Sequence, residues 1–399
     1  MQGDPSSSKL VIICYFILVV FSSSHVTGSD VTFVNVLDNG AVGDGHTDDS
    51  QAFLRAWNDA CDWDAQVINM IVPEGKTFVL KPTIFNGPCK SANLNVQIYG
   101  TLKAPKDTSV WEGLDATIWL AFKNVNGLAV FGSGTIDGQG SNWWAQSCRY
   151  NSSKKLSGGG FDICRVLNSR RHLKPLDCRA TAMHRPLEIK FISCQNSRLR
   201  DLHFMNSPNT HILIQYSNMF WVSNLTITSP KTTPNTDGIH IDGSTGVFID
   251  DSIIESGDDC ISIGDHTSNV QINNINCGPG HGVSVGSLGK GGSFAQVENI
   301  YVNNVNFSET TNGVRIKTWQ GGSGYARGIT FRQINFNNVQ YPIIIDQYYC
   351  DHQHPSSCTG KNADGVLISN VTYESVSGTS STQVSLVCGK PRMWIGEPA

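Results

Sequence analysis

The chain has 399 residues, a formal net charge of −4 at pH 7 and only 16% charged residues. This composition excludes a coiled coil and a charge-rich disordered protein, and it argues against a general binder of nucleic acids or membrane surfaces. The 39 glycines indicate many tight turns between short strands, and the twelve cysteines indicate an oxidising compartment.

The N-terminal segment has the pattern of a secretory signal peptide. An apolar run from Leu10 to Phe21 follows Lys9 and is too short to cross a bilayer comfortably. We therefore expect residues 1–28 to be removed, with cleavage near Gly28, and residues 29–399 to be secreted as a single domain. An uncleaved membrane anchor is the alternative.

The glycosylation signals and the cysteines also fit export. Four asparagines are each followed two residues later by Ser or Thr, the acceptor pattern for N-linked sugars: Asn151, Asn224, Asn306 and Asn370. Removal of Cys14 with the signal leaves eleven cysteines, an odd number that cannot pair completely within the chain.

A helix and a basic loop are the features predicted before the repeats begin. The helix runs from about Gln51 to Asn58, and the preceding Asp48-Asp49-Ser50 can cap it. Its apolar face contains Ala52, Phe53, Ala56 and Trp57. The stretch from Arg149 to Lys190 holds ten Lys or Arg residues against three Asp or Glu and is predicted to be a long loop.

The second half of the chain repeats itself with a period of about 22 to 30 residues. One series of similar short segments begins at Asp201, Asn224, Asp251, Asn274, Asn304, Gln333 and Asn370. A second series consists of the alternating apolar pairs Ile212/Ile214, Ile239/Ile241, Ile261/Ile263, Val283/Val285, Val314/Ile316 and Ile343/Ile345. Both series have the period of two residues that is typical of strands.

Two short strands per repeat, punctuated by Gly and Asn, indicate a parallel β-solenoid. Each coil buries its apolar face only by stacking on its neighbours, and the predicted N-terminal helix would cover the open end. A β-sandwich is the rival architecture, but it has no fixed repeat length. We therefore predict an all-β solenoid.

The strand register predicts a cluster of charged side chains. Because Ile239, Ile261 and Val283 are 22 residues apart, the residues two places before them, Asp237, Asp259 and His281, form a column on successive coils. Adjacent strands lie about 4.8 Å apart, so the outer two members are about 10 Å apart. Asp258 joins this column, and two coils later Arg315 and Lys317 share the outward side of one strand.

Strict alternation does not place all of these side chains outward. Asp258 has the parity of the outward Ser262, whereas Asp237 and Asp259 have the parity of the buried isoleucines. Gly238 and Gly257 would let the backbone turn and redirect them.

Simpler interpretations exist for each residue. The aspartates and His281 fit turns, the two cations fit a solvated face, and three acids can hold Ca²⁺. Their coincidence at one register favours chemistry instead. Like charges raise the pKa of one carboxyl and so provide an acid beside bases, as inverting glycoside hydrolysis requires, and nearby cations suit an acidic sugar.

Four motifs in this cluster resemble the signature of the polygalacturonases, the pectin-degrading members of glycoside hydrolase family 28, and most closely their secreted plant branch. The motifs are Asn235-Thr236-Asp237, Gly257-Asp258-Asp259, Gly280-His281-Gly282 and Arg315-Ile316-Lys317. The resemblance extends to Gly40 through Asp49, Gly134 through Gly140, and Asn206-Ser207-Pro208 through Ile212, and so covers most of the mature chain.

The resemblance implies a right-handed parallel β-helix that cleaves α-1,4 bonds of pectin or polygalacturonate with inversion, as an extracellular monomer in the cell wall. Asp258 would be the general acid, Asp237 and Asp259 would hold and activate water, and His281 would tune the acid or hold substrate. The implied substrate-binding residues are Asn235, Arg315, Lys317 and Tyr349. It also implies a Cys260–Cys277 disulfide and no metal or organic cofactor.

Two departures from the family pattern stand out. The stretch between Cys148 and Arg185 is longer and more basic than usual, which would alter the mouth of the cleft. After Cys388 the chain lacks the further cysteine and coils of the family, so we expect an exposed edge on the last coil and an unpaired Cys388. The alternatives to an active polygalacturonase are a hydrolase of a substituted pectin such as rhamnogalacturonan, and an inactive, truncated β-helix.

Overall fold

The computed structural model describes residues 31–147, 185–349, 365–382 and 393–394. The predicted signal peptide, Asn151, most of the basic loop, Cys388 and the expected C-terminal edge beyond residue 382 lie outside these residues, apart from one short strand at Met393–Trp394. No helix among the described residues has both the length and the apolar character needed to cross a membrane.

One face of the molecule is a sheet of nine parallel strands. These are β5 (Thr83–Asn86), β8 (Ile118–Lys123), β11 (Leu187–Ile192), β14 (Ile212–Gln215), β17 (Ile239–Asp242), β19 (Ile261–Ile263), β21 (Val283–Leu288), β23 (Asn312–Trp319) and β25 (Tyr341–Tyr349). They pair in chain order, so that each strand belongs to one coil and contacts the strands of the coils before and after it.

The other strands form two parallel ladders that merge into one sheet. The first ladder contains β1 (Val31–Asn35), β3 (Val67–Val72), β6 (Leu94–Ile98), β9 (Leu128–Phe131), β12 (Gln195–Arg200) and β15 (Asn218–Ser223). The second contains β2 (Asp44–Asp48), β4 (Thr77–Val79), β7 (Thr101–Lys103), β10 (Thr135–Asp137), β13 (His203–Met205) and β16 (Thr226–Thr228).

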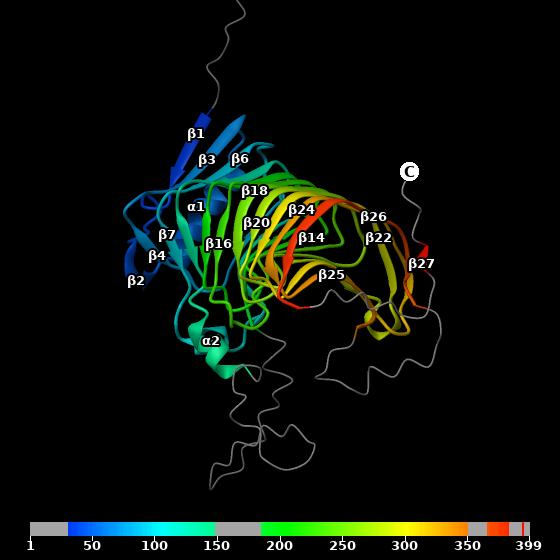
Figure 1. The fold of residues 1–399 in the computed structure, drawn as a ribbon. Helices are drawn as coiled ribbons and strands as arrows, with labels where there is room; N and C mark the ends of the chain where they lie inside the picture. Colours follow the sequence, from blue (N-terminus) through cyan, green and yellow to red (C-terminus); the bar gives the residue numbers. More distant parts are fainter. Residues whose placement is uncertain (1–30, 148–184, 350–364, 383–392, 395–399) are drawn as a thin grey trace, which may run out of the picture.

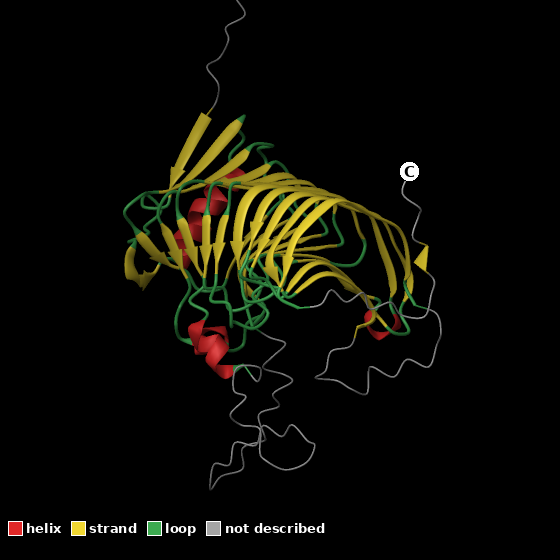
Figure 2. Cartoon of the chain, viewed as in Figure 1, coloured by secondary structure: helices red, strands yellow, loops and turns green. Residues whose placement is uncertain are grey.

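The two ladders meet at the long strand β18 (Thr245–Glu255), whose first half pairs with β15 and whose second half pairs with β16. The strands of the later coils are long in the same way, and they are β20 (Thr267–Cys277), β22 (Phe294–Ser308), β24 (Ser323–Val339) and β26 (Leu367–Ser380). Two residues of β27 (Met393–Trp394) pair with β26 at Ile368 and Ser369. Figures 1 and 2 show the resulting stack of curved parallel strands.

The predicted solenoid is confirmed, but each coil has three extended stretches rather than two. The missed stretch contains β12, β15 and the first halves of the later long strands. The second and third stretches of each coil meet at a corner. The residue at this corner is the one with which each segment of the first sequence series begins. All of these residues have a positive φ between 50° and 61°: Asp201, Asn224, Asp251, Asn274, Asn304, Gln333 and Asn370. Asn and Asp tolerate this left-handed conformation better than other non-glycine residues, which explains the repeated letters.

Large apolar side chains fill the inside of the coils. Phe85, Phe122 and Phe191 lie on β5, β8 and β11, with ring centroids 4.9 and 5.6 Å apart in stacked geometry. Phe220 on β15 then contacts Phe191 edge-on at 5.0 Å. All four are buried, so stacking the coils removes from water the surface that a single coil would expose.

The N-terminal helix is present and covers the core, but it is longer than predicted. Helix α1 runs over Ser50–Asp62. Its Trp57 packs on Phe85 and Phe122, with centroids 5.3 Å away in both cases, and Phe53 packs on Phe78 at 5.2 Å. The remaining short helices are α2 (Ser141–Gln146), η1 (Thr108–Trp111) and η3 (Lys290–Gly292).

The predicted capping segment stands at the start of α1, where Asp48 Oδ1 accepts a hydrogen bond of 3.1 Å from the backbone N–H of Ser50, the first residue of the helix. Asp49 is the N-cap residue, but its carboxylate accepts hydrogen bonds from the backbone N–H groups of Val42 and Gly43, at 2.7 and 3.2 Å, rather than from the helix. The side chain therefore fastens the preceding turn to the start of the helix.

The described residues contain two disulfides, Cys61–Cys89 and the expected Cys260–Cys277. Cys194 is buried and has no disulfide partner, and burial raises the pKa of its thiol to about 11. Cys194 was not singled out from the sequence, and Cys388, which we expect to be unpaired, lies outside the described residues.

Candidate active site

The charged cluster lies where three successive coils enter the nine-stranded sheet. Ile239 pairs with Ile261, Ile261 with Val283, and Val283 with Val314, as the sequence spacing indicated. Strand β23 is thus the direct neighbour of β21, so Arg315 lies one coil after His281 and two coils after Asp259.

Two of the aspartates lie in the turns that precede the strands, and these turns direct their side chains outward. Asp237 precedes β17 and Asp259 precedes β19, so the alternation of the strands does not apply to them. A Cβ on Gly257 would lie 2.0 Å from the Thr233 carbonyl oxygen, and one on Gly238 would lie 2.5 Å from that of Cys260. These glycines are therefore required by close backbone packing, whereas we had expected them to permit an unusual turn.

Asp259 is the most enclosed of the three acids, with 2% of its surface exposed. Arg315 Nη2 and Lys317 Nζ donate to its two carboxylate oxygens at 2.8 and 2.9 Å, and Ser284 Oγ donates at 2.8 Å. Two cations thus balance one buried carboxylate, and Arg315 is steadied by a further bond from its Nε to Ser284 Oγ at 3.0 Å. A guanidinium has five N–H donors and an ammonium three, so both cations retain donors for a second anion.

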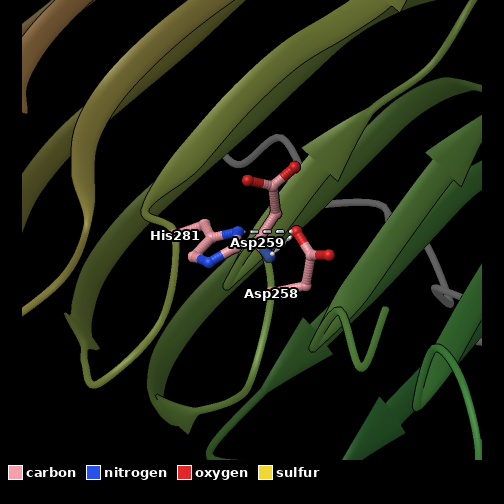
Figure 3. Close-up of side chains that lie close together, drawn as sticks. All are labelled: Asp258, Asp259 and His281. Atoms are coloured by element: carbon pink, nitrogen blue, oxygen red, sulfur yellow. Dashed lines mark hydrogen bonds and ion pairs between the residues drawn. The ribbon is translucent and has the colours of Figure 1, made fainter. Parts of the chain in front are cut away.

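Asp258 pairs with His281 instead. The Nδ1 of His281 lies 3.0 Å from Asp258 Oδ1, and the His281 backbone N–H donates to the Asp258 carbonyl at 2.7 Å. Figure 3 shows the imidazole beside the Asp258 carboxylate, while the Asp259 carboxylate points in another direction.

The pair holds a proton on the histidine. Burial acts to raise the pKa of Asp258, but the hydrogen bond and charge of His281, together with Lys317 and Arg315, lower it to about 2. Burial likewise acts to lower the pKa of His281, yet its contact with Asp258 raises it above the usual value.

Asp237 has the opposite character. Its Oδ2 accepts a hydrogen bond of 2.7 Å from Ser262 Oγ. Burial, followed by the negative charges of Asp258 and Asp259, raises the pKa of Asp237 to about 7, against the smaller effects of Ser262 and Lys317. The expected raised carboxyl is therefore present, but it is Asp237 and not Asp258.

Several polar partners of the acids were missed from the sequence. His240, Ser262, Ser284 and Arg315 occupy one register row across four neighbouring strands. Each stands between the two apolar residues by which the coils were aligned, so the alternation itself marks them as outward. We used this position for Arg315 and for the parity of Ser262, but overlooked His240, Ser284 and the contacts that Ser262 makes.

The two remaining candidate residues flank the acids. Asn235 Oδ1 accepts a hydrogen bond of 3.1 Å from the buried Arg185, whose other terminal nitrogen donates to the Pro234 carbonyl. Tyr349 lies under Lys317, with Nζ 5.5 Å from the ring centroid, and contacts Trp319 edge-on at 5.6 Å.

The cluster also has the composition of a cation site. Asp258, Asp259 and His281 each offer one ligand atom, and these atoms lie within 4.8 Å of one another. However, Arg315 and Lys317 already bind both oxygens of Asp259, and a divalent cation would be repelled by them. The charge balance therefore favours an anionic ligand.

Comparison with known proteins gives a consistent result. Residues 64–173 and 171–395 match "Glycosyl hydrolases family 28". A probable polygalacturonase of Arabidopsis thaliana is 42% identical over 347 residues, which cover 87% of this chain and 71% of that protein. A polygalacturonase of Persea americana is 41% identical over 405 residues, covering 97% of this chain and 80% of that protein.

A solved structure shares the fold. The endo-xylogalacturonan hydrolase of Aspergillus tubingensis superimposes with a TM-score of 0.68 over 92% of this chain and 99% of that chain, at 22% identity.

Proposed function

The chain belongs to the glycosyl hydrolases of family 28, and from this premise we propose that it is a polygalacturonase that hydrolyses the α-1,4 bonds between galacturonic acid residues of pectin. The observation that carries the proposal is the meeting of three carboxyls with Arg315 and Lys317 on one outer face. A glycosidase requires paired carboxyls, and a substrate whose sugars are carboxylates requires cations beside them.

Asp258 is the proposed general acid, and it receives its proton from His281. In the free protein the proton lies on His281, since the pKa of Asp258 is lowered and that of His281 is raised. An anionic sugar near Asp258 adds negative charge, which favours movement of the proton across the 3.0 Å contact onto Asp258. The acid then protonates the oxygen of the leaving sugar.

Asp237 and Asp259 are the proposed activators of the attacking water. Arg315 and Lys317 each bind one carboxylate oxygen of Asp259, and the same two cations retain donors that suit the substrate carboxylate. Asn235 and Tyr349, on either side, are proposed to contact neighbouring sugar residues.

We propose inversion at the anomeric carbon. The Asp258–Asp259 spacing of at most 4.8 Å between ligand atoms is shorter than the roughly 6.5–9.5 Å usual for inverting pairs. The proposal rests instead on the contacts of the acids, because Asp259 is bound by two cations and Asp258 by His281, which leaves neither as a ready nucleophile. Proton NMR during hydrolysis would show the β-anomer first from an α-linked substrate; the α-anomer first would contradict inversion.

The experiment that tests the function is a substrate panel. We expect the secreted protein to release reducing ends from polygalacturonate at mildly acidic pH, and less from rhamnogalacturonan, whose backbone has fewer carboxylates. Preference for rhamnogalacturonan would replace this assignment, and failure on every pectic substrate by a cooperatively folded protein would favour an inactive β-helix. Detection of the protein in the extracellular medium would test the proposed secretion to the cell wall.

A further inference from the structure

A chain of hydrogen bonds leads from Asp237 to a half-buried histidine that has no part in the proposed function. Ser262 Oγ lies 2.7 Å from Asp237 Oδ2 and also 2.7 Å from Nδ1 of His240. His240 and Ser262 are register partners on β17 and β19, so the strand pairing fixes this contact. Ser262 is buried, with 3% of its surface exposed, whereas part of the surface of His240 is exposed to solvent.

We propose that Ser262 and His240 are positioning residues that carry the proton acquired by Asp237 away to solvent after each turnover. This inference rests on the proposed function, in which Asp237 takes a proton from the attacking water. His281 would supply the proton of the general acid Asp258, and His240 would take up the proton that the base Asp237 acquires.

The proton balance closes over one turnover. Water gives a proton to Asp237 Oδ2 as its oxygen bonds to the anomeric carbon, while the glycosidic bond breaks and the leaving oxygen takes the proton of Asp258. The Asp237 proton then passes to Ser262 Oγ as the hydroxyl proton of Ser262 passes to His240 Nδ1. His240 releases its Nε2 proton to water and is left with its proton on Nδ1; exchange with solvent restores the Nε2–H tautomer before the next transfer. A solvent proton enters through His281 to Asp258, so that only water is consumed.

The surrounding charges permit this transfer. The groups that act on Asp237 are Asp258, Asp259 and Lys317, while His211 Nδ1 contacts its backbone carbonyl at 3.0 Å. Those that act on His240 are Asp242, Lys317 and Asp259. Burial is the largest effect on both, and it raises the pKa of Asp237 while lowering that of His240. The lowered pKa of His240 favours its neutral form, which can accept a proton, while the raised pKa of Asp237 favours the form that holds one.

The first test needs no substrate. The test uses ¹⁵N-histidine-labelled protein. If protons move along the hydrogen-bonded chain, His240 carries its proton on Nε2 when Asp237 is protonated and on Nδ1 when Asp237 is ionised. The two ring nitrogen shifts should therefore exchange character as the pH rises through about 7, where Asp237 titrates. Ser262→Ala should abolish this exchange. A His240 that keeps one tautomer from pH 6 to 9 in the unmodified protein would overturn the proposal.

The second test separates proton transfer from hydrogen bonding. The amide of His240→Asn reaches the position of Nδ1 and can donate to Ser262, but it cannot take a proton. We expect kcat on polygalacturonate to fall at least tenfold with little change in KM, and the solvent deuterium isotope effect to rise. His203→Asn, on the exposed face of β13, is the matched control and should behave as the unmodified protein.

An unchanged kcat and an unchanged isotope effect in His240→Asn would overturn the proposed proton transfer. A melting temperature of His240→Ala below that of the unmodified protein would then show that the role of His240 is structural. If the unmodified protein releases no reducing ends, the proposed function fails, and the tautomer measurement still judges the hydrogen-bonded chain.

Discussion

The same coils carry two polar rows that follow opposite rules. On the corners of the large sheet, Asn304 Nδ2 donates to Asn274 Oδ1 at 2.7 Å, and Asn274 Nδ2 donates to Asp251 Oδ1 at 2.9 Å. Amide and carboxylate side chains stack there, and each forms a hydrogen bond with the side chain at the same corner of the next coil. On the nine-stranded sheet, the corresponding row reads His240, Ser262, Ser284 and Arg315, and so changes from an imidazole through two hydroxyls to a guanidinium.

The difference shows how a repetitive fold can hold one chemical site. Neutral amides repeat without electrostatic cost and stabilise every coil in the same way. Charged groups of one sign cannot repeat on every coil, because like charges repel at the distance between adjacent strands. An acid on one coil therefore needs a cation or a hydroxyl group on a neighbouring coil. Departure from the repeat therefore marks the site.

The largest contrast is expected between replacing an aspartate of the charged cluster and replacing an aspartate of the corner row by asparagine. Asp258→Asn removes the proposed acid and should lower kcat about 10³-fold or more, measured as reducing ends released. Asp251→Asn should leave kcat unchanged, because Asn occupies this corner position in the next two coils. Equal activity of the two variants would contradict the assignment of the acid.

Removing one cation should weaken activity and change substrate preference. Lys317→Met keeps an apolar side chain on Tyr349, but it reduces the two cations bound to Asp259 to Arg315. We expect kcat/KM on polygalacturonate to fall roughly 10- to 100-fold, the range of one charge-assisted hydrogen bond, with a smaller fall on methyl-esterified pectin. Lys290→Met, an exposed lysine on η3, serves as control, and an equal fall on both substrates would argue against carboxylate binding.

The pH dependence follows from the proton that His281 supplies to Asp258. The contact with Asp258 raises the pKa of His281 above its usual value, while the pKa of Asp258 is lowered to about 2. The active form needs this proton on the Asp258–His281 pair. We expect kcat/KM to fall tenfold per pH unit above the pKa of His281; a plateau extending to pH 9 would show that this proton is not needed.

The two disulfides offer a milder comparison. Cys260–Cys277 closes a separation of 17 residues beside the catalytic turn, and Cys61–Cys89 closes 28 residues at α1. Replacing either pair by Ala should lower the free energy of unfolding by about 3 kcal/mol in urea titration. Only the Cys260/Cys277 variant should also lower kcat, so an equal kcat in both would show that this disulfide does not steady the site.

The smallest effect is expected on the repetitive row. Asn274→Ala loses two hydrogen bonds and places Ala at a φ of 57°, which should cost about 1–2 kcal/mol of unfolding free energy without changing kcat. Asn274→Gly loses the same bonds but accepts the positive φ, and should be the more stable of the two. The reverse order would mean that backbone strain is unimportant at this corner.

The sequence predicted the coils and their register because burial requires both. Apolar pairs such as Ile261/Ile263 must stack on the pairs of adjacent coils, and this brings Asp237, Asp258 and His281 together. It did not predict which of Asp258 and Asp259 meets the cations, because that depends on backbone packing in the turn at Gly257. The stretch that contains β12 and β15 was missed because in the later coils it continues into the next stretch as one long strand.

Cys194 has a consequence for how the chain matures. Its thiol donates weakly to the Phe122 carbonyl at 3.5 Å, and with a pKa of about 11 roughly one molecule in 10⁴ carries the reactive thiolate at neutral pH. Thiol–disulfide exchange requires a thiolate with access to a disulfide, and closure of the coil around Cys194 removes both. In an oxidising compartment, we therefore expect coil closure to compete with disulfide exchange, so that slowing the closure would let Cys194 form mispaired isomers.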